Sequence, residues 1–228
     1  MPGTLILATH GIAGGPGSAA AHARTIRRRG GWAEVRVGCL KAEPSLAAAL
    51  AGIPAPVTVV PLLMSAGVIH AAMARRLGEL APDGGWRLTA PVGDHPGLPA
   101  LALARADALR RRLGWRRATT SLLLIGHGTP RHGASAAHAQ AMAAALAGSF
   151  AAVGHALLEE QPRPLAAAAA FPAGGVIAVG LFLDHGPHGD DDVRAALSTL
   201  DRPVAYAGAI GADPALAALI LAQAAAVQ

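Results

Sequence analysis

Hydrophobic residues fall into short runs that alternate with longer stretches rich in alanine, leucine and arginine. The runs are bounded by glycine, proline or polar residues and are almost continuously apolar, which is typical of parallel strands buried on both faces. They predict strands at 4–9, 33–38, 56–63, 86–91, 120–126, 151–158, 175–183 and 203–207. The longer stretches have the length and composition of helices. They predict helices at 18–29, 45–52, 66–80, 97–113, 134–147, 163–170, 189–200 and 213–226.

The second half of the chain repeats the first. Leu5–Gly11 (LILATHG) matches Leu122–Gly128 (LLLIGHG), and Val59–Met64 (VVPLLM) matches Ala178–Leu183 (AVGLFL), at separations of 117 and 119 residues. Weaker matches at a separation of 118 are Pro44 with Pro162, and Gly93, Pro96 and Leu98 with Gly211, Pro214 and Leu216. Landmarks in the same order at a nearly constant separation indicate an internal duplication, with the two halves joined near residue 116.

The alternation of strands and helices predicts the fold of each half. It implies parallel sheets with right-handed crossovers. We therefore predict an α/β protein with two duplicated, doubly wound, flavodoxin-like lobes, 1–116 and 117–228. Each lobe has a mainly parallel four-stranded sheet with strand order 2-1-3-4. In such sheets ligands bind beyond the carboxyl ends of the strands where the strand order reverses, here between the first and third strands.

Histidines occur at this position in both halves. His10 and His127 follow the first strand of each half, and His70, His185 and His188 lie beyond the third. A single histidine at a strand end is more often a hydrogen-bonded loop residue, but the repetition of the pair favours a functional site. Imidazole suits Co²⁺, Ni²⁺, Fe²⁺ and Zn²⁺, and it can also accept a proton near neutral pH. These histidines are therefore candidates to bind a metal ion, and His185 with His188 is a candidate for a separate metal-collecting site.

Carboxylates near the histidines are candidates to relay protons or attract a cation. They are Glu43, Glu159, Glu160, Asp184, Asp190, Asp191 and Asp192. For Asp191 and Asp192 the favoured interpretation is a solvated first turn of a helix, where carboxylates suit the positive end of the helix dipole.

Composition and charge narrow the class of partner. Apolar residues make up 53% of the chain and aromatic residues 3%, so alanine, valine, leucine and isoleucine must build the core. The formal net charge is +5, with arginines clustered at 27–29, 75–76 and 110–117. The clusters could attract a polyanion. The aromatic platforms and zinc-finger patterns of nucleic-acid-binding proteins are missing from the sequence, so we expect no nucleic acid partner, and a small polycarboxylate suits the charge.

The single cysteine and the long uncharged segments indicate in which cellular compartment the protein is expected. Cys39 cannot form an internal disulfide, which favours a reducing cytoplasm, and a cysteine-based metal site is excluded. The uncharged stretches 51–74 and 164–183 are interrupted by prolines, which favours buried strands with flanking turns over membrane spans. We therefore expect a cytoplasmic protein with no membrane association.

The motifs together resemble those of the class II tetrapyrrole chelatases, the sirohydrochlorin cobaltochelatase and ferrochelatase family. The second half supplies His127-Gly128-Thr129, Leu181-Phe182-Leu183, Gly186-Pro187-His188 and Gly211–Leu216. The first half supplies His10-Gly11, Pro61-Leu62-Leu63-Met64, Gly67, His70 and Gly93–Leu98. The first half departs from the pattern in two places: Ile12 replaces the usual serine or threonine, and His70 lies three residues after Gly67, whereas His188 lies two after Gly186.

The resemblance implies an enzyme, a metal chelatase that inserts Co²⁺ or Fe²⁺ into sirohydrochlorin, with the tetrapyrrole in a cleft between the lobes. The metal is a substrate and no organic cofactor is implied. His10 and His70 would bind the ion and accept pyrrole protons in one half, and His127 and His188 in the other. Both halves keep their histidines, and the resemblance slightly favours the first pair.

Two alternatives stay open on the sequence alone. A cobalt or nickel delivery protein could use the same histidines without catalysis, and a chelatase could act with another metal such as Ni²⁺. Tetrapyrrole binding separates the first alternative from an enzyme. Because an internal duplication can replace a dimer of half-length chains, we expect a monomer.

Overall fold

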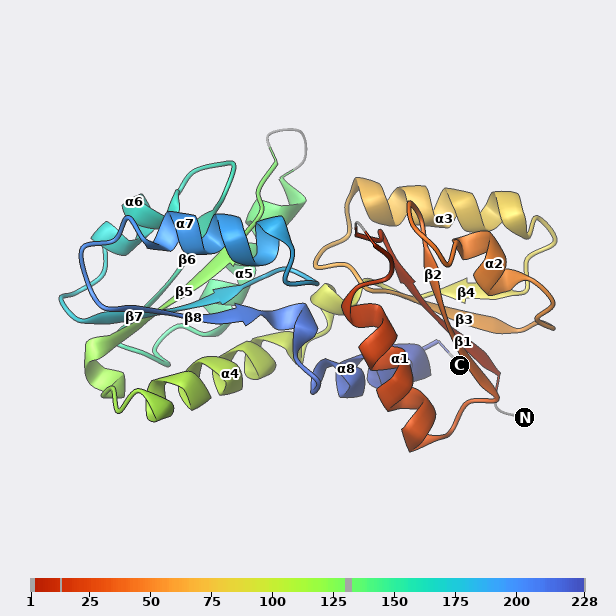
Figure 1. Cartoon of the computed structure of the whole chain (residues 1–228), viewed down its shortest axis with the longest axis horizontal. Coiled ribbons are helices and arrows are strands. Elements are labelled where there is room, and N and C mark those ends of the chain that lie inside the picture. Colours follow the sequence, from red (N-terminus) through yellow and green to blue (C-terminus); the bar gives the residue numbers. More distant parts are fainter. Residues whose placement is uncertain (1–2, 13, 130–132, 228) are drawn as a thin grey trace. The chain divides into compact units, whose positions relative to one another are not determined.

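The strands form two parallel four-stranded sheets, one from each half of the sequence (Figure 1). The computed structural model describes residues 3–12, 14–129 and 133–227. The first sheet has the order β2-β1-β3-β4 and the second the order β6-β5-β7-β8, so the predicted order 2-1-3-4 is confirmed in both. The strands are β1 (Thr4–Thr9), β2 (Glu34–Cys39), β3 (Val57–Pro61), β4 (Trp86–Leu88), β5 (Thr120–Gly126), β6 (Ala152–Leu157), β7 (Gly175–Gly180) and β8 (Val204–Ala209).

The central strands explain why the apolar runs are nearly continuous. Every residue of β1, β3 and β5 is buried, because helices cover both faces of the sheets. The helices are α1 (Ser18–Arg29), α2 (Leu46–Leu50), α3 (Val68–Leu80), α4 (Leu98–Arg112), α5 (Ala134–Ala145), α6 (Pro164–Ala169), α7 (Asp192–Leu197) and α8 (Leu216–Ala225). Short 3₁₀ turns occupy Val92–Asp94 (η1), Arg117–Thr119 (η2) and Ile210–Ala212 (η4), and a π-helical turn occupies Pro187–Asp191 (η3). The predicted helix at 189–200 is therefore a π turn followed by a shorter α-helix.

The chain divides into two compact units that exchange their last helices. Unit 1 comprises Met1–His95 and Asp213–Gln228, and unit 2 comprises Pro96–Ala212. Helix α4 belongs to the first sequence repeat but packs on β7 and β8, whereas α8 belongs to the second repeat and packs on α1 and β3. The compact units therefore differ from the lobes expected at 1–116 and 117–228. The repeat in the sequence identifies each helix but does not specify which of the two similar sheets that helix will cover.

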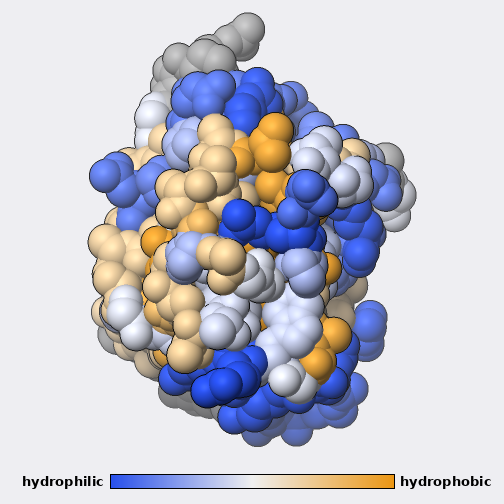
Figure 2. Space-filling view, turned by 90° about the vertical axis from the view of Figure 1, so that its left-hand side faces the viewer, coloured by the Kyte–Doolittle hydropathy of each residue, from blue (hydrophilic) through white to orange (hydrophobic). Residues whose placement is uncertain are grey.

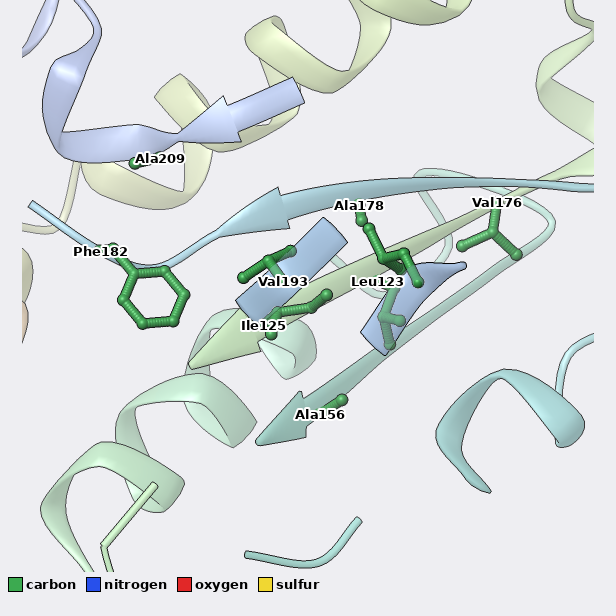
Figure 3. Close-up of a cluster of buried hydrophobic side chains, with 9 residues drawn as sticks. Leu123, Ile125, Ala156, Val176, Ala178, Phe182, Val193 and Ala209 are labelled. Atoms are coloured by element: carbon green, nitrogen blue, oxygen red, sulfur yellow. The ribbon is translucent and has the colours of Figure 1, made fainter. Parts of the chain in front are cut away.

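Aliphatic side chains build the core of each unit, as the composition requires. In unit 2, Leu123 and Ile125 of β5 lie against Val193 of α7, with Val176 from β7 and the ring of Phe182 beside them (Figure 3). In unit 1, α2 and α3 cover one face of the sheet through a similar aliphatic cluster. Three aromatic rings of unit 2 lie on strand glycines. The pairs are Trp115 with Gly175, Phe171 with Gly154 and Tyr206 with Gly180.

Basic residues predicted to attract a polyanion partly serve the fold. In unit 2, Asp107 of α4 is largely buried and forms ion pairs with Arg110, Arg111 and Arg117. The hydrogen bond from Arg110, assisted by the three positive charges, lowers the pKa of Asp107 below its usual range. This cluster is thereby engaged in holding the start of the second sequence repeat to α4.

The surface of unit 2 around the amino ends of its strands faces the viewer in Figure 2. Strongly hydrophobic residues occupy small separate areas there, and hydrophilic residues surround them. Among the described residues, no helix is long and apolar enough to cross a bilayer.

The exchange of helices predicts which sheet each helix stabilises. Ile220 of α8 and Leu98 of α4 are both fully buried. Truncation of either side chain to alanine should destabilise its unit by about 2–5 kcal/mol. We expect Ile220→Ala to raise amide hydrogen exchange in β1 and β3, and Leu98→Ala, the matched control, to raise it in β7 and β8. Mass spectrometry of peptides from each sheet measures this, and the reverse pattern would contradict the exchange.

Candidate active site

Each first strand ends in a turn that presents a histidine. His127 follows β5 and is succeeded by Gly128, whose φ of 75° is readily adopted only by glycine. A Cβ atom at Gly128 would lie 3.2 Å from the backbone nitrogen of Glu160, so the turn also packs too closely for a side chain. His10 and Gly11 form the same turn after β1, with φ of 89° at the glycine. The repeated glycine after the histidine is therefore a requirement of backbone geometry at both strand ends.

The third strands present their histidines differently. In unit 2 the segment after β7 forms the π turn η3, and His188 is its second residue. In unit 1 a regular helix, α3, begins at Val68, and His70 lies in its first turn. The one-residue difference in spacing after Gly67 and Gly186 thus corresponds to a different backbone structure. Single π turns are frequent at functional sites.

Unit 2 brings its two predicted histidines together. The ring centroids of His127 and His188 are 4.6 Å apart with an interplanar angle of 75°. Phe182 lies 6.5 Å from His127 in an edge-on arrangement, which links the pair to the hydrophobic core. Because β5 and β7 are parallel neighbours, their carboxyl ends meet at one edge of the sheet, and the two histidines meet with them.

The hydrogen bonds of these rings assign their tautomers. The Nδ1 atom of His127 lies 2.7 Å from the carbonyl oxygen of Gly128, and a carbonyl can only accept, so Nδ1 carries the hydrogen. The Nδ1 atom of His188 lies 2.7 Å from Oδ2 of Asp192, a carboxylate that likewise accepts. The lone pair of a neutral imidazole is then on Nε2 in both rings. A histidine that binds metal through one nitrogen usually donates its other N–H to a carbonyl or carboxylate in this way.

Two carboxylates accompany the pair in unit 2. Asp192 is about half exposed and contacts His188, and Oε2 of Glu159 lies 3.6 Å from Nδ1 of His127. Asp192 thus lies exposed in the first turn of α7, as expected, and in addition accepts a hydrogen bond from His188. Glu160 has another task, because it accepts a hydrogen bond from the backbone nitrogen of Thr129 and holds the turn after His127.

In unit 1 both histidines form hydrogen bonds with backbone carbonyl oxygens. The Nδ1 atom of His10 lies 3.1 Å from the carbonyl oxygen of Gly11, as in the turn of His127. His70 differs, because its Nε2 lies 3.3 Å from the carbonyl oxygen of Thr89 and must be the donor. Glu43, the acidic candidate of this unit, accepts a hydrogen bond from the backbone nitrogen of Ser45. The lone pair of His70 is therefore on Nδ1, whereas that of His188 is on Nε2.

The two units also differ in the charge beside the first histidine. The backbone nitrogen of Glu159 donates to the carbonyl of His127, and the backbone nitrogen of Lys41 donates to the carbonyl of His10. Lys41 therefore occupies in unit 1 the place that Glu159 occupies in unit 2. The residue four positions after His70 is Ala74, whereas Asp192 is four positions after His188. The carboxylates that favour a cation are found beside the pair of unit 2.

His185 lies against a different part of unit 2. A Cβ atom at Gly208 of β8 would lie 2.7 Å from Cε1 of His185 and 2.9 Å from Nη2 of Arg105. His185 is thus close to a guanidinium, whose positive charge disfavours a metal ion nearby. Within the residues that the structure describes, no group of three or more histidine, cysteine, aspartate or glutamate side chains is arranged to hold a metal ion. A metal ion bound by His127 and His188 would complete its coordination with water or with a second substrate.

Comparison with known proteins identifies the family. The sequence profile of CbiX matches residues 4–109 and again residues 121–227, which together cover most of the chain. The chain belongs to the CbiX family. The double match agrees with the internal duplication, and the four-stranded sheets agree with the fold of a CbiX structure described as that of the terminal enzyme for biosynthesis of siroheme in denitrifying bacteria. That structure is 28% identical, covers 99% of both chains and has a TM-score of 0.77.

Two further proteins resemble the present chain over almost its whole length. A Halobacterium salinarum protein named "Probable sirohydrochlorin cobaltochelatase" is 27% identical over 97% of this chain and 90% of its own. A multi-domain Deinococcus radiodurans protein, described as structurally similar to chelatases with two additional novel domains, is 26% identical with a TM-score of 0.77. The match covers 99% of the present chain and 55% of the Deinococcus protein, so the present chain spans about half the length of this relative.

The contact between Asp192 and His188 predicts a specific effect on metal binding. Asp192→Asn keeps the shape of the side chain but removes the charge that fixes and polarises His188, so we expect Co²⁺ affinity to fall about 10- to 100-fold. Isothermal titration of Co²⁺ into the protein measures this. Asp191→Asn, in the neighbouring exposed residue, is the control and should change the affinity less than twofold. Equal affinities of the two variants would show that Asp192 does not support the histidine.

Proposed function

We propose that this CbiX chain is a chelatase that inserts a divalent metal ion, Co²⁺ or Fe²⁺, into sirohydrochlorin. The observation that supports it most directly is the contact between His127 and His188, whose hydrogen bonds leave Nε2 of both rings with a free lone pair. Membership of the CbiX family and the names of the relatives support the choice of substrate. Imidazole nitrogen suits both ions, so the donors alone favour neither metal.

The proposed reaction exchanges the metal ion for the two pyrrole N–H protons of the macrocycle. In the first step, Nε2 of His127 and of His188 hold the ion while water completes its coordination. As the ion passes to the pyrrole nitrogens, the same lone pairs become free to accept the displaced protons. The protonated ring of His188 then lies beside Asp192, and the protonated ring of His127 lies beside Glu159. The negative charge of each carboxylate stabilises the positive charge of its ring. The rings thereby serve first as ligands and then as bases.

We assign the first half a complementary part in the same reaction. His10 and His70 also carry free lone pairs and are further proton acceptors or ligands in this proposal. Lys41, which replaces Glu159 in this half, would favour a substrate carboxylate over a free cation. Sirohydrochlorin is a polycarboxylate, so a positive charge near His10 and His70 would favour its binding.

The reaction requires no oxidant or reductant, because only cations are exchanged, and we propose that it uses no organic cofactor. We also propose that the duplicated chain acts as a monomer in a reducing cytoplasm. The single cysteine, Cys39, is buried in β2 and cannot form a disulfide within the chain, which suits that compartment.

Anaerobic metal insertion tests the proposal. Purified protein is mixed with sirohydrochlorin and Co²⁺ or Fe²⁺, and the absorbance change of the macrocycle gives the rate. We expect the wild type to exceed the protein-free rate, and His127→Ala and His188→Ala each to lower it about 100-fold or more, since ligand and base are lost together. His155→Ala, a mid-strand histidine of β6, is the control and should retain the wild-type rate.

Two results would contradict the proposal at different levels. A wild-type rate equal to the protein-free rate, without binding of the macrocycle, would exclude a chelatase. Loss of activity only in His10→Ala or His70→Ala would keep the chelatase but move the working pair to the first half.

A further inference from the structure

Tyr206 contacts the turn that carries His188. It is the only tyrosine of the chain and lies on β8, next to β7 in the sheet. Its hydroxyl donates a hydrogen bond of 2.5 Å to the carbonyl oxygen of Gly189, the residue directly after His188. A side chain from the edge strand is thus bonded to the middle of the π turn η3.

Two glycines make this contact sterically feasible. A Cβ atom at Gly180, the last residue of β7, would lie 2.2 Å from the tyrosine hydroxyl oxygen, so only glycine lets the ring pass over the strand. A Cβ atom at Gly189 would lie 2.0 Å from the carbonyl oxygen of Asp184, so the turn packs directly on the preceding loop. The backbone of the turn is therefore confined between that loop and the phenol.

Charged residues hold the same turn from outside. Arg194 of α7 forms an ion pair of 2.9 Å with Asp190, and its guanidinium lies 5.4 Å from the centre of the Tyr206 ring. The hydrogen bond from Arg194 also lowers the pKa of Asp190. The backbone nitrogen of Asp190 closes the turn on the carbonyl of Gly186.

Within the described residues of the first half, 3–12 and 14–116, neither this arrangement nor a π turn is found. Leu88 pairs with Val59 in the first sheet as Tyr206 pairs with Ala178 in the second, so leucine occupies the tyrosine position. The equivalent of Arg194, Arg76, pairs with Glu79 of its own helix. A regular helix follows there, with His70 in the opposite tautomer. The tyrosine and the π turn therefore occur together in the half whose histidines are in contact.

We propose that Tyr206 is a positioning residue, whose hydrogen bond to Gly189 fixes the π turn and thereby directs the ring of His188 toward His127. The consequence for metal binding rests on this geometry alone, and the consequence for insertion rests on the proposed function. Displacement of a catalytic group by about 1 Å can lower a rate 100-fold.

Titration of the phenol checks the geometry, because one tyrosine gives one signal. Burial away from water, with a further contribution from the negative charge of Asp190, raises the pKa of Tyr206 above its ordinary value. The folded protein then retains a proton that the unfolded chain loses near pH 10, so stability should decrease as the pH rises above about 10. An absorbance titration at alkaline pH should show that Tyr206 ionises at a higher pH than free tyrosine. Ionisation at the ordinary pH would overturn the buried hydrogen bond.

Tyr206→Phe tests the proposal, with Co²⁺ alone as the first probe. We expect Co²⁺ affinity to fall about tenfold, the insertion kcat to fall by a similar factor, and the KM for sirohydrochlorin to stay within twofold. Thr120→Val is the control, because it removes another buried hydroxyl that donates to a carbonyl in unit 2, at the far end of β5. The double variant His188→Ala/Tyr206→Phe should bind Co²⁺ no more weakly than His188→Ala, since the tyrosine acts through that ring.

The outcomes separate this proposal from the proposed function. Wild-type Co²⁺ affinity in Tyr206→Phe, or an additive loss in the double variant, would overturn the positioning role. Weaker Co²⁺ binding in Tyr206→Phe together with no insertion by the wild type would keep the role and refute the chelatase. If Tyr206→Phe fails to fold, Asp190→Asn decides, because it loosens the same turn from its exposed side. A fall in Co²⁺ affinity there supports the proposal, and wild-type affinity overturns it.

Discussion

The parallel pairing of the first and third strands in each half is the constraint on which the site depends. Ladder hydrogen bonds bring the carboxyl ends of β5 and β7 to the same edge of the sheet, 50 or more positions apart in sequence. The turns that follow must begin there, and the glycine after His127 allows the chain to leave the strand so that the imidazole stays at the edge. The helices on both faces then bury the strands and fix that edge. The topology therefore brings both histidines to one edge of the sheet, and the local turns determine whether the two rings meet.

The duplication has preserved this backbone while the side chains around it have diverged. The same backbone hydrogen bond, from the second residue after the second strand, supports both first histidines, yet it comes from Lys41 in one half and from Glu159 in the other. Asp192 has no acidic equivalent at Ala74. The residue beside the first histidine thus differs in charge between the two halves, which would suit the proposed reaction of a cation with a polycarboxylate.

Much of this organisation could be predicted from the sequence because it is repetitive and periodic. The buried strands, their order and the strand-end histidines follow from apolar runs, from the repeat and from the rule for parallel sheets. The exchange of helices could not be predicted, since α4 and α8 fit either sheet by composition. The π turn could not be predicted either, because the one-residue shift between His70 and His188 is visible in the sequence but its backbone structure is not. Tyr206 was missed, although a single tyrosine at the end of a predicted strand in an aromatic-poor chain was a signal.

The central claim is that His127 and His188 share one tautomer and direct Nε2 lone pairs at one ion. Long-range ¹H–¹⁵N correlation spectra of the histidine side chains, recorded before and after addition of Zn²⁺ as a diamagnetic probe, test it most directly. We predict that both rings carry hydrogen on Nδ1 in the free protein and that Zn²⁺ shifts their Nε2 resonances together at the same ratio of metal to protein. Hydrogen on Nε2 of either ring, or shifts confined to His10 and His70, would contradict the claim.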